Sequence, residues 1–307
     1  MDKSKSLTRY VIISPAKDES ARIEKTIQSI LAQTVRPAKW VIVDDGSSDN
    51  TAEIVERYCG VADWISLIRV SRDASRKLGS AEIRAFNKGS QSIRIGDFDY
   101  LVKLDCDLDL PPDYFEQLIE RFNADERLGI ASGLYYEKDE TGWVPAFLPP
   151  YHAAGASKMI RAQCYRDIGG FPLDPGWDSA DEIKAQVRGW KTAHFPEIQF
   201  RHLRTEGSAA GMLSTCALHG HVHYVTGGGF FFLFAKFLQR SILYKPYLFA
   251  GIAMLWGYLR ARVTDQRLLV TSSEAAFYRQ LLNARLKSDA GRVLRLGKLR
   301  RQEQGSN

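Results

Sequence analysis

The chain has 307 residues, of which 45% are hydrophobic and 25% are charged, as in a globular protein with a sizeable buried core. Its four cysteines are scattered without a Cys-x-x-Cys spacing, which argues against a disulfide framework or a zinc site. Such cysteine usage is typical of a reducing, cytosolic setting. The polar start of the chain, MDKSKSLTRY, has no apolar stretch of the kind found in a secretory signal.

Short apolar runs alternate with helical segments over the first third of the chain. Buried strands are predicted at residues 10–13, 40–43, 64–70 and 100–104. Helices are predicted between them at residues 19–33, 51–58 and 79–95. This alternation predicts an α/β fold with a mostly parallel sheet and helices on both faces.

Acidic residues follow two of the predicted strands. Asp44 and Asp45 come directly after the second strand, and Asp105 and Asp107 come after the fourth. Ligands of such folds bind beyond the carboxyl ends of the strands, so these carboxylates should converge on one crevice. The Asp-x-Asp pair offers hard oxygen ligands for Mg²⁺ or Mn²⁺, although taken alone it is equally typical of a solvated loop.

The pattern loosens beyond residue 130. Residues 133–160 contain glycine, proline and several aromatics, so irregular structure over a site is expected there. A helix is predicted from Asp178 to Gly189 and a final short strand from Phe195 to His202.

The last third of the chain carries two uncharged stretches and a basic end. Neither stretch, 207–235 or 246–259, offers the roughly 20 predominantly apolar residues that a membrane-spanning helix needs. We therefore predict interfacial helices over residues 225–259, with a subdomain packed on the core or on a second subunit as the alternative. The net charge is +6, and residues 260–307 hold 11 Lys and Arg against 4 Asp and Glu. This basic tail suits an anionic membrane surface, or is a solvated helix.

Three segments in order carry a family resemblance: YVIISPAKDESARIEKTIQSILAQT, WVIVDDGSSDNTAEIV and LVKLDCDLDL. They resemble the nucleotide-binding half of the family 2 glycosyltransferases of the GT-A fold, and the likeness extends over residues 10 to about 204. The resemblance implies transfer of a sugar from a nucleotide-diphosphate donor with inversion of the anomeric centre. It also implies a GT-A domain over residues 1–205, which leaves residues 206–307 as a helical extension.

The resemblance implies roles for several residues near the donor. Asp107 would ligate the divalent cation directly, and Asp105 would contact the ribose or a metal-bound water. Asp45 would accept an N–H of the base, which suits uracil or guanine. Late in the domain, His202 is a further metal or phosphate ligand or else structural, and Arg204 is a candidate phosphate clamp. The nucleoside pocket would be lined by Ser14, Pro15, Ala16 and Glu19.

An inverting transfer needs a carboxylate that takes the proton from the acceptor hydroxyl. Family members place this base at the start of a helix, ahead of a Gly-Trp-Lys turn, and the matching position here is Asp178. The sequence departs from the usual Glu-Asp pair, because Trp177 stands where the Glu would be. Asp181 is the base in a second possible register. Trp177 either stacks on an acceptor sugar or belongs to the core.

These observations predict a metal-dependent inverting glycosyltransferase that acts on a glycan or lipid-linked acceptor at the cytoplasmic face of the inner membrane. Cell-envelope or exopolysaccharide assembly would be its setting. A nucleotidyltransferase is disfavoured, because residues 14–19 lack the glycines of its usual loop. A scaffold that keeps the sugar-nucleotide pocket without turnover is the alternative from another class. Nucleic-acid binding is not expected, since the basic tail has no interleaved aromatics.

Overall fold

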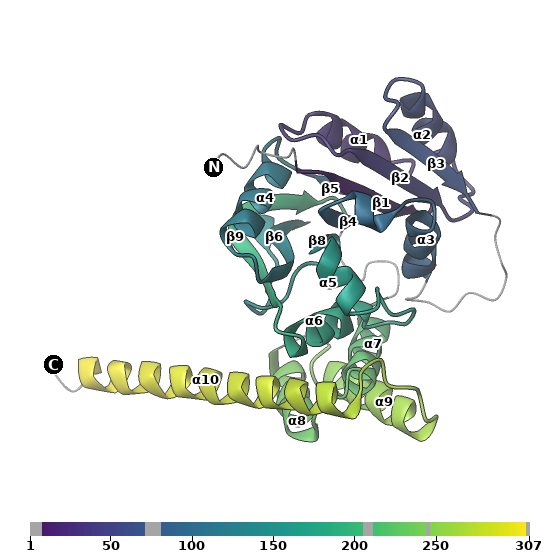
Figure 1. Ribbon diagram of the computed structural model, residues 1–307. Coiled ribbons are helices and arrows are strands. Elements are labelled where there is room, and N and C mark those ends of the chain that lie inside the picture. The colour runs from purple at the N-terminus through teal and green to yellow at the C-terminus, as the bar shows by residue number, and fades with distance from the viewer. Residues whose placement is uncertain (1–7, 71–80, 205–210, 244–245, 305–307) are drawn as a thin grey trace. The chain divides into compact units, whose positions relative to one another are not determined.

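The computed structural model describes residues 8–70, 81–204, 211–243 and 246–304, with the side chains of 243 and 289–304 left out. The chain divides into two compact units, Met1–Ser208 and Ala209–Asn307. The first contains the whole sheet, and the second is helical over its described residues (Figure 1).

One nine-stranded sheet forms the centre of the first unit, with the order β3-β2-β1-β4-β8-β6-β9-β5 and β7 paired to β6. The strands are β1 (Tyr10–Ala16), β2 (Lys39–Asp44), β3 (Ile65–Arg69), β4 (Tyr100–Leu104), β5 (Leu108–Asp109), β6 (Leu128–Asp139), β7 (Gly142–Pro145), β8 (Ser157–Arg161) and β9 (Lys191–His202).

The sheet has a parallel half and a mixed half. β1 pairs in parallel with β2 and β4, and β2 with β3, as the strand–helix alternation predicted. β8 runs antiparallel to both β4 and β6, whereas β6 and β9 are parallel. The expectation of irregular structure over residues 133–160 was wrong in part, because this range contains β7, most of β6 and part of β8. The glycines and partly exposed aromatic residues of the β6–β7 hairpin interrupt the apolar pattern by which strands were predicted.

Helices cover both faces of the sheet. α1 (Ile23–Leu31), α2 (Thr51–Cys59) and α4 (Tyr114–Ala124) pack on the face that buries Tyr10 and Ile12. α3 (Ala81–Ser90), α5 (Ala162–Asp167) and α6 (Trp177–Val187) pack on the face that buries Val11 and Ile13. Alternate β1 side chains thus enter two separate cores, because successive residues of a strand point to opposite faces. A 3₁₀ turn (Ile95–Asp97) precedes β4.

The second unit consists of α7 (Met212–Val225), α8 (Phe230–Leu243), α9 (Leu248–Val263) and α10 (Ser272–Gln304). α7 and α9 cross closely at Gly220 and Gly257, where an added Cβ atom would lie within 2 Å of a carbonyl oxygen of the other helix. None of the described helices has both the length and the apolar character that a membrane crossing requires.

Candidate active site

The parallel strands bring the first acidic cluster next to the end of β1. Ala16 pairs with Asp44 in the β1–β2 register, and the Asp45 amide donates to the Ala16 carbonyl at 2.9 Å. The thiol of Cys106 lies 3.5 Å from the carbonyl oxygen of Pro15. The Asp-x-Asp segment therefore lies beside the end of β1, as expected for neighbouring parallel strands.

Ser14 is buried like Ala16, which lies on the same face of β1. Its side chain is fully buried, and its hydroxyl accepts a hydrogen bond from the Trp40 indole N–H at 2.9 Å. The Ser14 hydroxyl is thus engaged in the core under the first sheet face.

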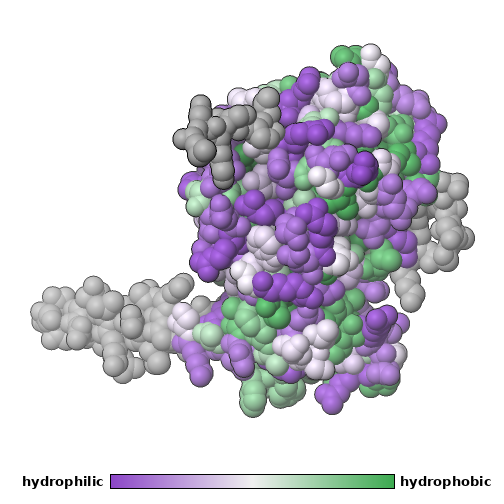
Figure 2. All heavy atoms as spheres, viewed as in Figure 1, coloured by the Kyte–Doolittle hydropathy of each residue, from purple (hydrophilic) through white to green (hydrophobic). Residues whose placement is uncertain are grey.

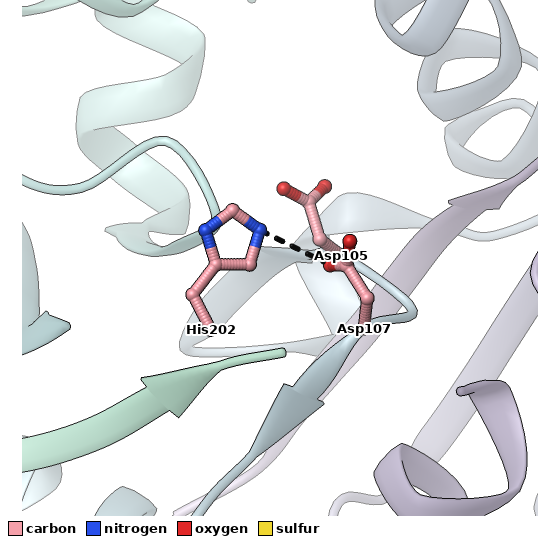
Figure 3. Close-up of side chains that lie close together, drawn as sticks. All are labelled: Asp105, Asp107 and His202. Carbon is pink, nitrogen blue, oxygen red and sulfur yellow. Dashed lines mark ion pairs between the residues drawn. The ribbon is translucent and has the colours of Figure 1, made fainter. Parts of the chain in front are cut away.

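Among the described residues, one group of metal-ligand side chains lies close enough together to hold an ion, namely Asp105, Asp107 and His202. One ligand atom of each lies within 4.8 Å of the other two (Figure 3). The aspartates follow β4, and His202 ends β9, where it pairs with Leu108 of β5. The short β5 strand thus places two segments 95 residues apart around one point.

Cationic groups surround Asp107. Its Oδ1 lies 3.3 Å from Nε2 of His202, and its Oδ2 lies 3.3 Å from Nε of Arg204. Burial on its own would raise the pKa of Asp107, but the neighbouring imidazole of His202, together with the charge of Arg204, holds it below its usual value. Nδ1 of His202 contacts Oε1 of Glu137 at 3.2 Å, which fixes the ring with Nε2 toward Asp107.

A buried lysine holds Asp105. Nζ of Lys103 lies 2.5 Å from Oδ1 of Asp105 and 3.2 Å from Oε2 of Glu82. Lys103 is 1% exposed, so its charge is compensated by these two carboxylates. Burial raises the pKa of Asp105 to about 6, although the Lys103 charge opposes the rise. One carboxylate of the Asp-x-Asp pair is therefore already neutralised by the protein.

Arg204 connects the metal-ligand group to Glu19, which lies in the loop between β1 and α1. Besides Asp107, its guanidinium binds the carboxylate of Glu19, a residue of the expected nucleoside pocket. Burial and the nearby charge of Asp107 raise the pKa of Glu19 to about 7, against the pull of Arg204. The arrangement brings Glu19, Asp105, Asp107, His202 and Arg204 together at one edge of the sheet.

The two candidates for the catalytic base differ sharply in their surroundings. Asp178 is half-buried at the start of α6, and its Oδ2 lies next to Gly155, where an added Cβ atom would stand 3.7 Å away. Asp181 is fully buried, and both of its oxygens accept hydrogen bonds from Nζ of Lys158 at 3.0 and 3.1 Å. Trp177 is 4% exposed, so it belongs to the core and is not an open sugar platform.

Sequence reasoning missed the buried polar cluster beneath α6. Lys158 of β8 is fully buried and also donates to Glu182 at 3.2 Å. His152 contacts the other oxygen of Glu182 at 2.9 Å. Burial raises the pKa of Asp181, although the charge of Lys158 opposes the rise. The signal available in the sequence was a lysine inside a short strand pattern, SKMIR, directly before the apolar Met159 and Ile160.

The His152–Glu182 contact predicts a pH dependence of stability. Burial opposes charging of His152, but Glu182 and Asp178 outweigh burial and the repulsion of Lys158, so its pKa is raised. A raised histidine pKa stabilises the fold below the unfolded value near 6.5, and this stabilisation is lost as the pH rises through the folded value. We expect the melting temperature to fall from pH 6 to pH 9, and to fall less in His152→Gln. Equal slopes in the two proteins would contradict this assignment.

The donor set fits a divalent cation. Oδ1 of Asp107 is buried and accepts no hydrogen bond from any described residue, so a lone pair remains available there. Two carboxylates and an imidazole suit Mn²⁺ and, with additional waters, Mg²⁺. The charge of Lys103 beside Asp105 leaves Asp107 as the carboxylate best placed to ligate.

A comparison with protein-family models identifies residues 11–170 as a match to the model described as glycosyl transferase family 2. This match covers half of the chain, including β1 through β8 and both acidic clusters. The chain belongs to glycosyl transferase family 2. The family resemblance seen in the three sequence segments is thereby confirmed, and the protein is a glycosyltransferase.

Curated relatives match a shorter part of the chain. The poly-β-1,6-N-acetyl-D-glucosamine synthase of Staphylococcus aureus (strain COL) is 33% identical over 116 residues, which is 38% of this chain and 26% of that protein. The Staphylococcus epidermidis enzyme of the same name is 28% identical over 116 residues, again 38% and 26% of the two chains. The match thus spans about a quarter of the length of these relatives.

Solved structures of similar fold cover most of the chain. The mannosyltransferase PcManGT of Pyrobaculum calidifontis, in complex with GDP-Man and Mn²⁺, has a TM-score of 0.56 at 18% identity over 91% of this chain and 80% of its own. GalNAc-T7 with UDP, GalNAc and Mn²⁺ also has a TM-score of 0.56, at 17% identity over 86% and 59%. TarS 1-349 of S. aureus with UDP-GlcNAc has a TM-score of 0.53 at 14% identity over 84% and 73%. These similarities confirm the predicted GT-A fold.

Proposed function

We propose that this glycosyltransferase is metal-dependent and inverting, and that it uses a nucleotide-diphosphate sugar. The observation that carries the proposal is the convergence of Asp105, Asp107 and His202 within 4.8 Å beyond the carboxyl ends of the strands. Similar folds with Mn²⁺ and a nucleotide or nucleotide sugar support it.

Each residue of the proposed donor site has a separate role. Asp107 and His202 hold the cation, which when bound supplies Lewis-acid stabilisation of charge on the departing nucleoside diphosphate. Asp105, held by Lys103, contacts the ribose or a water of the cation. Arg204 turns from Glu19 toward the diphosphate, and Asp45 accepts an N–H of the base.

Asp178 is the proposed general base. It is half-buried at the start of α6, where it can reach an acceptor hydroxyl, whereas Asp181 is enclosed and bound to Lys158. A carboxylate in this role takes the hydroxyl proton as the oxygen attacks the anomeric carbon, and the bond to the diphosphate breaks on the opposite side. The donor site then retains the nucleoside diphosphate until release.

Melting with nucleotides tests the donor site. UDP, GDP and their sugar conjugates are each added with and without Mn²⁺. A ligand at about 100 times its Kd stabilises the native state by roughly 2.7 kcal/mol, which is readily visible as a melting shift. We expect a shift with one base, dependent on Mn²⁺. No shift with any of these ligands would overturn the proposal.

For the acceptor, we propose a glycan or lipid-linked sugar of a cell-envelope or extracellular polysaccharide. The relatives named poly-β-1,6-N-acetyl-D-glucosamine synthase support this class. The second unit supports a lipid surface, because α8 and α9 expose large apolar side chains, part of the hydrophobic area seen in Figure 2. The most exposed of them are Phe230, Phe231, Ile242, Leu248, Phe249, Trp256 and Val263. Their display suits interfacial helices at the cytoplasmic face of the inner membrane.

Sedimentation with vesicles tests the lipid surface. Phe231 and Phe249 are 78% and 64% exposed, so charged substitutions there should not disturb the core. We expect the protein to sediment with vesicles of phosphatidylglycerol and phosphatidylcholine, and Phe231→Asp/Phe249→Asp to remain in the supernatant with an unchanged melting temperature. Val61→Asp, at a 78% exposed position of the first unit, is the matched control. Equal sedimentation of all three proteins would contradict the assignment.

A further inference from the structure

Two buried lysines lie side by side on the neighbouring strands β4 and β8 in the middle of the sheet. Lys103 of β4 and Lys158 of β8 are register partners, and they are 1% and 0% exposed. Like charges directly opposite each other on neighbouring strands repel, and the cost grows on burial. A pair in this position therefore requires strong compensation from the elements that cover it, namely α3 and α6.

Separate carboxylates compensate the two lysines. Lys103 is bound by Asp105 and Glu82, whereas Lys158 is bound by Asp181 and Glu182. Lys158 also donates to the backbone carbonyl of the proposed base, Asp178, at 2.7 Å. One lysine thus holds a donor-site carboxylate, and the other holds the start of the helix that carries the base.

Trp177 connects the two lysine clusters. Its ring centroid lies 5.3 Å from Nζ of Lys103 and 5.1 Å from Nζ of Lys158, within cation–π range of both. Its indole N–H donates to Oε1 of Glu82 at 2.7 Å, while Oε2 of Glu82 accepts from Lys103 at 3.2 Å. Glu82 therefore uses one oxygen for α6 and the other for the lysine that holds Asp105.

These contacts form a continuous path, Asp105–Lys103–Glu82–Trp177, from the donor site to the residue before Asp178. We propose that Glu82, Lys103 and Trp177 are positioning residues that couple the donor site to α6, so that Asp178 is aligned when the donor is bound. The inference rests on the proposed function. It also accounts for the tryptophan beside the base, because this side chain closes the path between two buried charges.

Glu82→Gln tests the coupling, because the Glu82 side chain is 41% exposed and Asp105 still compensates the charge of Lys103 after the substitution. In glutamine an NH₂ group replaces one of the two carboxylate oxygens, and this group cannot accept the hydrogen bond of Trp177 or of Lys103 that the lost oxygen accepted. We expect kcat to fall about 10- to 100-fold, as for a misplaced catalytic group. The KM for the donor should change less than about twofold, since this substitution leaves the donor contacts in place.

Matched controls separate this effect from a general loss of stability. Glu53→Gln removes an exposed carboxylate on α2 that pairs with Arg69 at 3.7 Å. Trp190→Phe removes an indole hydrogen bond to Asp167 at 3.0 Å, the counterpart of Trp177→Phe. Both controls should keep wild-type kcat. The double variant Glu82→Gln/Trp177→Phe should lose no more activity than the worse single variant, because both single changes interrupt the same path of contacts.

Hydrogen exchange of α6 gives a readout that does not need turnover. With UDP–Mn²⁺ or GDP–Mn²⁺, whichever shifts the melting of the wild type, we expect slower exchange of residues 177–187. In Glu82→Gln the nucleotide should still bind while this added protection disappears. Three results would overturn the coupling without contradicting the proposed donor site. They are equal protection in both proteins, additive losses of activity in the double variant, and loss of nucleotide binding in Glu82→Gln. Failure of both nucleotides to bind the wild type would instead overturn the proposed function and the coupling with it.

Discussion

Asp107→Asn is expected to abolish the Mn²⁺-dependent melting shift caused by the donor nucleotide. The substitution keeps the size of the side chain but removes the anion that faces His202 and Arg204 at 3.3 Å. The buried Oδ1, which accepts no hydrogen bond from the described residues, loses its charge as well. Transfer should fall about 10³-fold, in the range measured when one electrostatic contribution to the transition state is removed. Initial rates with saturating donor measure this loss.

Asp109→Asn is the control for the donor site. Asp109 lies two residues further along in β5, and its carboxylate pairs with Lys25 at 3.4 Å, outside the compact group of ligands. It should keep both the nucleotide shift and the transfer rate. A Mn²⁺-dependent shift that survives in Asp107→Asn would contradict the assignment of Asp107 as a ligand.

Asp178→Asn is expected to separate binding from chemistry. A general base contributes typically 10²- to 10⁴-fold to the rate, so kcat should fall by about that factor. Donor binding and the melting temperature should remain close to wild type, because the side chain is half-buried and the fold uses the Asp178 backbone carbonyl, which asparagine retains. The measurements are kcat, the Kd of the nucleotide and the melting curve. A rival scaffold role would leave the cellular function of this variant intact.

Asp181→Asn is expected to lower the stability of the fold while most of the activity per folded molecule remains. Asp181 is fully buried and bound to Lys158 by both carboxylate oxygens, so its replacement weakens the compensation of a buried cation. We expect a loss of up to about 3 kcal/mol in the free energy of unfolding, since Glu182 still compensates Lys158 in part. The residual activity per folded molecule should stay well above that of Asp178→Asn. A stable Asp181→Asn protein without activity would transfer the role of base to Asp181.

The sequence by itself determined the first half of the domain and the region of the site. Mostly apolar runs of four to seven residues, separated by helical periodicity, predicted β1 to β4, because strands buried in a parallel sheet are rich in apolar residues. Since the carboxyl ends of parallel strands meet at one edge, the positions of Asp45, Asp105 and Asp107 followed from local pattern alone. The basic, helical end of the chain was also visible in composition.

Only the tertiary structure decided which of the remaining residues act together. Glu82 and Trp177 are 95 residues apart, and no local pattern predicts the hydrogen bond between them. Asp178 and Asp181 lie on one helix, so their different exposure depends on what packs against it, here Lys158 from β8. The antiparallel insertion of β8 between β4 and β6 is likewise a long-range pairing. Contacts between segments distant along the chain are set by the packing of the whole sheet, and for that reason they leave no periodicity in the sequence.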